Sequence, residues 1–149
     1  MKHLTILITV IMIIASCNNA ADNKETGVKT HADSLMDEVM EGHDAAMAKS
    51  NKISGAQKLV RQSLDSLDKL SPTLKKAATP YKIQLDSLAA NLKYAESGMD
   101  KWMEEFNMDS AKNDADLRTK YLEAEKEKVN QVKEKMISVL QQADSLLKK

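Results

Sequence analysis

The sequence predicts an all-α protein, an up-down-up antiparallel three-helix bundle with coiled-coil-like packing. Glycine occurs four times and proline twice in 149 residues, and aromatic residues make up 3%, so few residues would interrupt a helix. Apolar residues recur at alternating spacings of three and four, which places them along one face of a helix. No run alternates apolar and polar residues in the way that a half-buried strand does.

The first helix is expected over residues 33–70, with Thr30 or Asp33 as its cap. Gly55 costs the helix about 1 kcal/mol relative to alanine, but the register of the apolar face is the same on both sides of it, so one long helix is predicted. The positions expected on this face are Met36, Val39, His43, Ala46, Ser50, Ile53, Gln57, Val60, Leu64 and Leu67.

Two prolines are expected to separate the first helix from the second, which is predicted over residues 80–106. Ser71-Pro72 should end the first helix, because the residue before a proline is pushed out of the α region. Thr79-Pro80 should begin the second, since a threonine N-cap followed by proline at the first helical position is a start signal. The apolar face is regular: Tyr81, Leu85, Leu88, Leu92, Ala95, Met99, Trp102 and Phe106.

A polar turn over residues 107–113 leads to a third helix, predicted over residues 113–148. Short connections turn successive helices back on each other, which favours a bundle over an extended coiled-coil oligomer. Dimerisation of the bundle stays open. The expected apolar positions of the third helix are Leu117, Tyr121 or Leu122, Val129, Val132, Met136, Val139, Ala143 and Leu146.

Residues 1–16 have the pattern of a secretory signal peptide: a short basic start, Met1-Lys2-His3, precedes an apolar run from Leu4 to Ala15. That run is too short for a membrane-spanning helix, which needs roughly 20 apolar residues. It closes on Ile14-Ala15-Ser16-Cys17, which resembles the lipobox of bacterial lipoproteins. The sequence therefore predicts cleavage before Cys17 and a lipid on that cysteine, which would hold the protein on a membrane.

Residues 17–32 read as a polar, flexible tether between the lipid and the bundle, which is expected over residues 33–149. The cell envelope is the predicted location. Asn18 and Asn19 follow Cys17 in place of the aspartate that is associated with inner-membrane retention in some bacteria. The periplasmic face of the outer membrane is therefore favoured, with exposure on the cell surface as the alternative. Cys17 is the one cysteine of the chain, so no disulfide can form within it.

Charge and motifs exclude several classes of function. Lys and Arg number 22, as do Asp and Glu, and the two signs are interleaved, whereas a nucleic-acid-binding protein needs clustered basic residues. The sequence contains no Gly-rich phosphate loop, no His-Glu-x-x-His and no Gly-x-Ser-x-Gly. We therefore expect neither nucleic-acid binding nor enzymatic activity.

One cluster of residues suggests a metal site. In a helical hairpin that turns near residue 75, facing positions on the first two helices have numbers that sum to about 150, which brings His43 level with Trp102. Thioether and imidazole ligands favour Cu(I) or Ag(I), and a tryptophan ring can lie over such a cation. The candidate ligands are His43, Met47, Met99, Met103 and Met40, with Trp102 as a cap.

The alternative interpretation is that these residues are core. Methionine is a flexible filler of helical cores, and a core histidine is more often hydrogen-bonded than bound to a metal, so His43 can be oriented by the adjacent Asp44. Haem binding by a methionine and a histidine is a further alternative, without covalent attachment, because there is no Cys-x-x-Cys-His motif.

The stretches 36–49 and 99–106 carry two patterns, Met-x-x-His-Asp-x-x-Met and Trp-Met-x-x-Phe. With them the sequence resembles a group of small bacterial envelope lipoproteins often labelled viral A-type inclusion protein-like. The resemblance covers most of the chain after residue 16 and implies the fold and the location, with no established activity. The expected function is a structural or protein-interaction role in the envelope, with an envelope protein or a second copy as partner; soft-metal or haem binding is the alternative.

Overall fold

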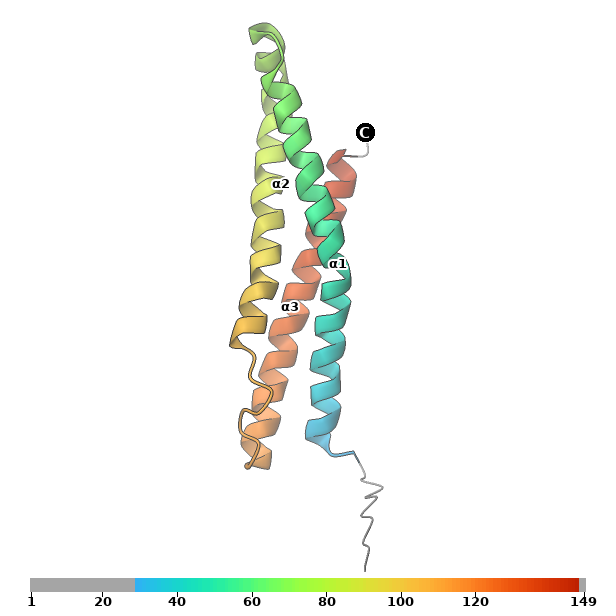
Figure 1. The fold of residues 1–149 in the computed structure, drawn as a ribbon, viewed down its shortest axis with the longest axis vertical. Helices are drawn as coiled ribbons and strands as arrows, with labels where there is room; N and C mark the ends of the chain where they lie inside the picture. Colours follow the sequence, from blue (N-terminus) through green and yellow to red (C-terminus); the bar gives the residue numbers. More distant parts are fainter. Residues whose placement is uncertain (1–28, 148–149) are drawn as a thin grey trace, which may run out of the picture.

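A computed structural model of the chain describes residues 29–147 as three long helices that all pack against one another (Figure 1). The helices are α1, His31–Asp68, α2, Pro72–Glu105, and α3, Ala115–Leu147. The predicted all-α, up-down-up bundle is thus confirmed. The predicted signal peptide, the lipid site Cys17 and the tether up to residue 28 lie outside the described residues.

The core of the bundle runs along the axis between the three helices and consists almost entirely of aliphatic side chains. The first helix crosses Gly55 without interruption, as predicted. Buried apolar residues are Leu35, Val39, Ala46, Ile53, Ala56 and Val60 on α1, Leu85, Leu88, Leu92, Ala95, Met99 and Trp102 on α2, and Leu122, Val129, Met136, Val139 and Ala143 on α3.

A capping box fixes the start of α1. The hydroxyl of Thr30 accepts a hydrogen bond from the backbone N–H of Asp33, and the carboxylate of Asp33 accepts one from the backbone N–H of Thr30. Two backbone donors that the helix itself cannot satisfy are thereby paired. The Thr30 hydroxyl also lies 2.7 Å from the Asp33 carboxylate and donates to it. This hydrogen bond and, after it, the one from the Thr30 backbone N–H lower the pKa of the Asp33 carboxyl, because they stabilise its charged form.

The prediction that the second helix begins at Pro80 is wrong: α2 begins at Pro72 and contains Pro80 in its interior. Ser71 is extended, with φ −62° and ψ 156°, and it occupies the N-cap position that the sequence analysis assigned to Thr79. Pro72 has no backbone N–H, but the helix loses no hydrogen bond through it, because the N–H groups of the first turn have no acceptor inside the helix. Pro80 lies in an exposed part of α2, where water can serve the carbonyl that proline leaves without a donor.

The buried face of α1 differs from the predicted one by single positions. Leu35, Gly42 and Ala56 are buried, whereas the predicted Met36, His43 and Gln57 lie beside them and are only partly buried. A helix in a three-helix bundle contacts two neighbours, so its buried face is wider than a single row of apolar residues. Gly42 takes the position at which Val129 of α3 approaches α1 closely.

Two residues of α3 also depart from expectation. Leu117 was predicted to be in the core but is 56% exposed, because the turns just before α3 leave its first turn at the end of the bundle. Glu125 is 4% exposed, between Leu122 and Val129 on the buried face. It is the one buried charged residue within 29–147, and its carboxylate accepts a hydrogen bond of 2.8 Å from the Lys128 ammonium.

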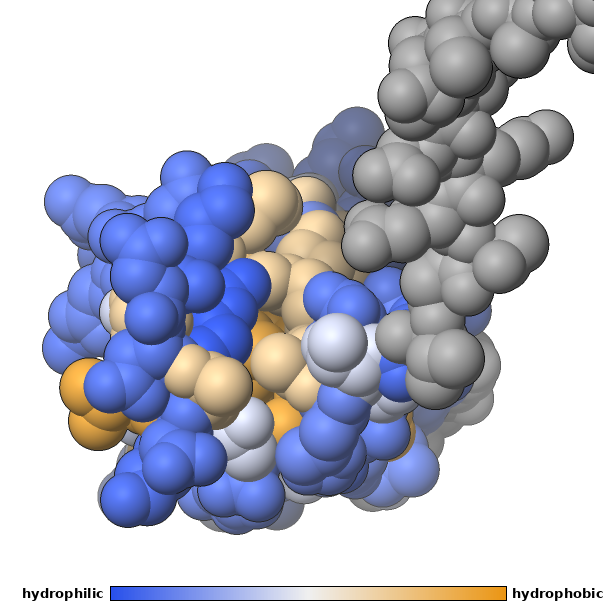
Figure 2. Space-filling model, turned by 90° about the horizontal axis from the view of Figure 1, so that it is seen from below, coloured by the Kyte–Doolittle hydropathy of each residue, from blue (hydrophilic) through white to orange (hydrophobic). Residues whose placement is uncertain are grey.

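The two ends of the bundle differ. Figure 1 shows the hairpin of α1 and α2 extending past the end of α3, which reaches only as far as the stretch 83–88 of α2. We call residues 61–84 the hairpin tip; none of them is buried. At the opposite end, where the chain enters α1, Figure 2 shows apolar surface in the middle of the end face with hydrophilic residues around it.

Candidate functional site

Four rings form a row near the end at which the chain enters α1. The His43 and Trp102 ring centroids are 5.7 Å apart, Trp102 and Phe106 are stacked at 4.8 Å, and Phe106 and Tyr121 are stacked at 6.2 Å. The level predicted from the hairpin register is confirmed for His43 and Trp102. We call these four residues the aromatic row, and it links all three helices.

One polar atom of the aromatic row is hydrogen-bonded and another is not. The Tyr121 hydroxyl accepts a hydrogen bond of 2.7 Å from the backbone N–H of Asn107, just after α2 ends. The Nε1–H of Trp102 is buried without a hydrogen-bond partner, which sets it apart from every other buried side-chain N or O within 29–147. A buried donor without an acceptor costs about 1–3 kcal/mol, so the packing of the ring must outweigh this loss.

The candidate metal ligands differ in how far they are exposed and in what they contact. Met99 is 2% exposed, whereas Met47 and Met103 are 38% and 40% exposed. The Nδ1 of His43 lies 2.9 Å from the Asp44 carboxylate, as in the alternative that the adjacent aspartate orients the ring. Met40 is partly buried one turn before His43 on α1.

Two of the candidates do line a common hollow. Met47 and Met99 border a space of about 160 Å³ together with Met136 of α3, so that three methionines from three helices surround it. We call this space the methionine hollow; its remaining lining residues are Ser50, Ile53, Glu96 and Asp100. The sequence analysis placed Met136 in the core but did not include it among the ligands. His43, Met40 and Met103 do not line this hollow.

Within residues 29–147 there is no cluster of three or more His, Cys, Asp or Glu side chains arranged to hold a metal ion. Methionine thioethers, which bind soft metals, are not among these side-chain types, and the methionine hollow presents three of them.

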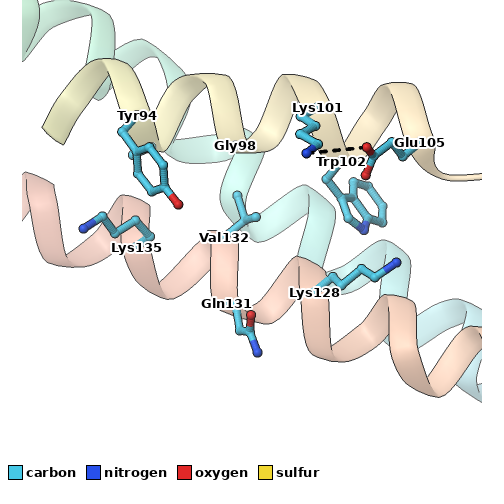
Figure 3. A pocket seen from close by; sticks show the side chains of 10 residues that line it. Tyr94, Gly98, Lys101, Trp102, Glu105, Lys128, Gln131, Val132 and Lys135 are labelled. Carbon is cyan, nitrogen blue, oxygen red and sulfur yellow. Dashed lines mark ion pairs between the residues drawn. The ribbon is translucent and has the colours of Figure 1, made fainter. Parts of the chain in front are cut away.

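A larger groove runs between α2 and α3 (Figure 3). Its volume is about 450 Å³, within the range of small-molecule sites. Gly98 lies opposite Val132 in this groove, and a Cβ atom at Gly98 would be in ordinary van der Waals contact with the Val132 methyl groups, at 3.9 Å. We call it the α2–α3 groove; its lining residues are Tyr94, Ala95, Gly98, Lys101, Trp102, Glu105, Lys128, Gln131, Val132 and Lys135.

The charges along the α2–α3 groove are unevenly paired. Lys101 lies 3.7 Å from Glu105, and Lys128 donates to the buried Glu125. This hydrogen bond raises the pKa of the Lys128 ammonium. Lys135 lies over the Tyr94 ring, 5.6 Å from its centroid, and among the described residues no carboxylate comes within ion-pair distance of it. One end of the groove thus presents a cation that is not neutralised.

The hairpin tip is the other distinctive surface. It carries five basic residues, Arg61, Lys69, Lys75, Lys76 and Lys82, against two acidic residues, Asp65 and Asp68, although the whole chain is balanced. Two large apolar side chains stand out on it: Leu74 is 54% exposed and Ile83 is 62% exposed. The sequence analysis did not predict this surface, because it placed the start of the second helix at Pro80 and so treated residues 72–79 as a connection instead of the first turns of a helix.

Comparison with known proteins identifies no relative: no family model, no curated protein and no solved structure matches the chain significantly. None of the three described helices combines the length and the hydropathy that a membrane-crossing helix needs.

Proposed function

We propose that this protein is a lipid-anchored component of the bacterial cell envelope that displays the hairpin tip to a protein partner. The observation that carries the proposal is the position of the tip. The chain enters α1 at one end of the bundle, and the uncovered hairpin lies at the other (Figure 1). At about 1.5 Å per helical residue, the 38 residues of α1 place the end of this helix, within the tip, about 57 Å from the point where the chain enters it.

The chemistry of the tip indicates the kind of partner. Arg61 to Gln84 contain no buried residue, so the two helices contact each other there without a third to cover them. Exposed apolar side chains beside an excess of basic residues suit a partner helix with an apolar face and acidic flanks. The anchor in this proposal is the lipid on Cys17, with the bundle held on the periplasmic face of the outer membrane.

Anchoring is tested by fractionation of cells that make the wild type or Cys17→Ser. The wild type should be found with the membranes and should incorporate labelled palmitate, whereas Cys17→Ser should do neither. A Cys17→Ser protein that still sediments with membranes would contradict the lipid anchor.

Display of the tip is tested by site-specific photocrosslinking in cells. A crosslinker at Ile83 should give one discrete adduct, which should disappear when Leu74→Glu is added. The control position is Ser54, which is exposed at mid-height on α1 and should give no adduct. An adduct between two copies of this chain would show that the partner of the tip is a second copy and not another protein. Equal amounts of adduct from Ser54 and Ile83 would refute the tip as the contact surface.

The methionine hollow supports a second candidate function, the binding of Cu(I) or Ag(I). Met47, Met99 and Met136 approach it from three helices, and thioethers are ligands for soft monovalent metals. Met47 is 38% exposed, which gives a metal ion a route from solvent. Haem has no comparable support among the described residues, because the hollow measures only about 160 Å³.

A Cu(I) titration against a chromophoric chelator tests this candidate and also decides between the two sets of ligands. Loss of one-to-one binding in Met136→Leu, with binding retained in His43→Ala, would assign the site to the hollow. Loss in His43→Ala and Met103→Leu would instead favour the set expected from the sequence. No competition with the chelator by the wild type would leave these residues as core.

A further inference from the structure

We propose that the α2–α3 groove binds a single-chain aliphatic carboxylate, with the carboxylate at the Lys135 end and the hydrocarbon chain directed towards Trp102. This site is separate from the hairpin tip and from the methionine hollow, and it does not depend on the proposed function.

The polar end of the groove has the groups that a carboxylate needs. The Lys135 ammonium lies over the Tyr94 ring, which holds it at the mouth. In Figure 3 the Tyr94 hydroxyl and the Lys135 ammonium lie at the same end of the groove. Lys101 and Lys128 each have a carboxylate partner, so Lys135 is the lining cation that remains for an anion.

The rest of the groove suits a hydrocarbon chain. Its apolar lining consists of Ala95, Gly98, Val132 and Trp102, and its polar lining beyond Lys135 and Tyr94 consists of Lys101, Glu105, Lys128 and Gln131. In Figure 3 Gly98 and Val132 lie between Tyr94 and Trp102, with Trp102 at the end opposite Tyr94. From Tyr94 to Trp102 is eight residues, or about 12 Å of helix at 1.5 Å per residue. A linear chain of about ten carbon atoms matches that length, and each methylene that it buries contributes about 0.8 kcal/mol.

Gly98 explains why the groove is open. Its position is in the middle of α2, where glycine is about 1 kcal/mol less favourable than alanine. A Cβ atom there would fit in ordinary van der Waals contact with the Val132 methyl groups, at 3.9 Å, so packing against Val132 does not demand a glycine. A larger side chain would extend into the groove, whereas glycine leaves that part of it available to a ligand.

The experiment measures the binding of decanoate, below its micelle concentration, to the full chain carrying Cys17→Ser. Trp102 is the one tryptophan of the chain, so its fluorescence reports on the groove, and equilibrium dialysis with labelled decanoate gives the stoichiometry. Saturable one-to-one binding with a change in Trp102 emission is expected. Lys135→Gln should weaken it about two- to fivefold, as for other partly exposed ion pairs.

Gly98→Leu should abolish binding, because the new side chain fills the floor of the groove. It should leave the protein folded, since leucine is a better helix former than glycine. The matched control is Gly55→Leu, at a helical glycine with nothing within 4 Å, which should bind as the wild type does. The proposal is overturned if the wild type shows no saturable binding, if Gly98→Leu binds as Gly55→Leu does, or if decyltrimethylammonium binds as tightly as decanoate.

Discussion

Gly42 of α1 lies against Val129 of α3 so closely that a Cβ atom at Gly42 would come within 2.9 Å of the Val129 Cγ1 atom. No side chain can occupy that position without displacing its neighbour, and Val129 is fully buried. The absence of a side chain at Gly42 therefore allows the close approach of α1 and α3.

We predict that Gly42→Ala destabilises the bundle although alanine favours a helix. Overpacking of a core costs about 1–3 kcal/mol, and the gain in helix propensity is about 1 kcal/mol, so a net loss of about 1 kcal/mol is expected. Urea unfolding followed by circular dichroism measures it. The control Gly55→Ala should stabilise the protein by about 0.5–1 kcal/mol, since nothing lies within 4 Å of that position. Equal effects of the two substitutions would contradict the close contact.

Tyr121→Phe should destabilise the bundle by about 1 kcal/mol, because it removes the acceptor of the Asn107 N–H. The stacking with Phe106 would remain. Hydrogen exchange should show that the Asn107 amide loses protection more than other amides do. Tyr94→Phe is the control, since that side chain is 69% exposed and its loss should change stability by less than about 0.5 kcal/mol. Unchanged protection at Asn107 would mean that the hydrogen bond contributes little.

Lys128→Met should cost about 1–3 kcal/mol, because it leaves the buried Glu125 carboxylate without its donor. The lower part of that range is expected, since the Lys128 side chain is itself 56% exposed. Lys126→Met is the matched control: Lys126 pairs with Glu38, whose side chain is 46% exposed, and such pairs contribute about 0–1 kcal/mol. Chemical denaturation of both variants gives the comparison, and a larger loss in Lys126→Met would refute the interpretation.

Pro80→Ala should stabilise α2, because it restores a backbone donor and removes the steric conflict of proline with the preceding turn. The effect should reach about 1–3 kcal/mol and appear as increased amide protection around residues 76–84. Pro72→Ala should have little effect, since proline is well suited to the first turn of a helix, where Pro72 lies. If Pro72→Ala stabilised the protein more than Pro80→Ala, the assignment of the helix start would be wrong.

The capping box predicts a dependence of stability on pH. The folded-state pKa of Asp33 is below its ordinary value of 3.8, so its contribution is fully present above that value and is lost as the pH falls through the folded-state pKa. Thermal melting between pH 7 and pH 2 should show this loss in the wild type and a smaller one in Asp33→Asn. Thr30→Val removes the hydroxyl that donates to the Asp33 carboxylate, so this variant too should lose less stability than the wild type as the pH falls. Identical pH profiles for all three proteins would contradict it.

Much of the fold was predictable because hydrophobic periodicity determines which faces are buried. Leu85, Leu88, Leu92, Ala95, Met99 and Trp102 were all expected in the core and all are buried. The buried residues that were not predicted depend on tertiary contacts, which the local sequence pattern does not contain. Gly42 is buried because of the approach of Val129, and Glu125 because its charge is paired at the edge of the core.

The surfaces were less predictable than the core. The hairpin register correctly brought His43 level with Trp102, since it depends only on helix lengths and the position of the turn. The α2–α3 groove depends on the absence of a side chain at Gly98, and on which lysines lack a partner, and neither is visible in one sequence. The hairpin tip was missed because Thr79-Pro80 has the local pattern of a helix start although α2 is already formed at that point.

The lack of buried residues in the hairpin tip has a consequence for how the molecule opens. The last turns of α1 and the first turns of α2 lie beyond the buried core residues Val60 and Leu85, and the side chains that join them to that core, Leu64, Leu67 and Tyr81, are only partly buried. This stretch should therefore exchange its amides at lower free energy than the rest. Brief digestion with trypsin should cut the hairpin first after Lys69, which lies exposed in the turn between α1 and α2, and next at Lys75 and Lys76 in the first turns of α2. The two fragments should stay associated through the three-helix part, as a nicked molecule that keeps its helical circular dichroism.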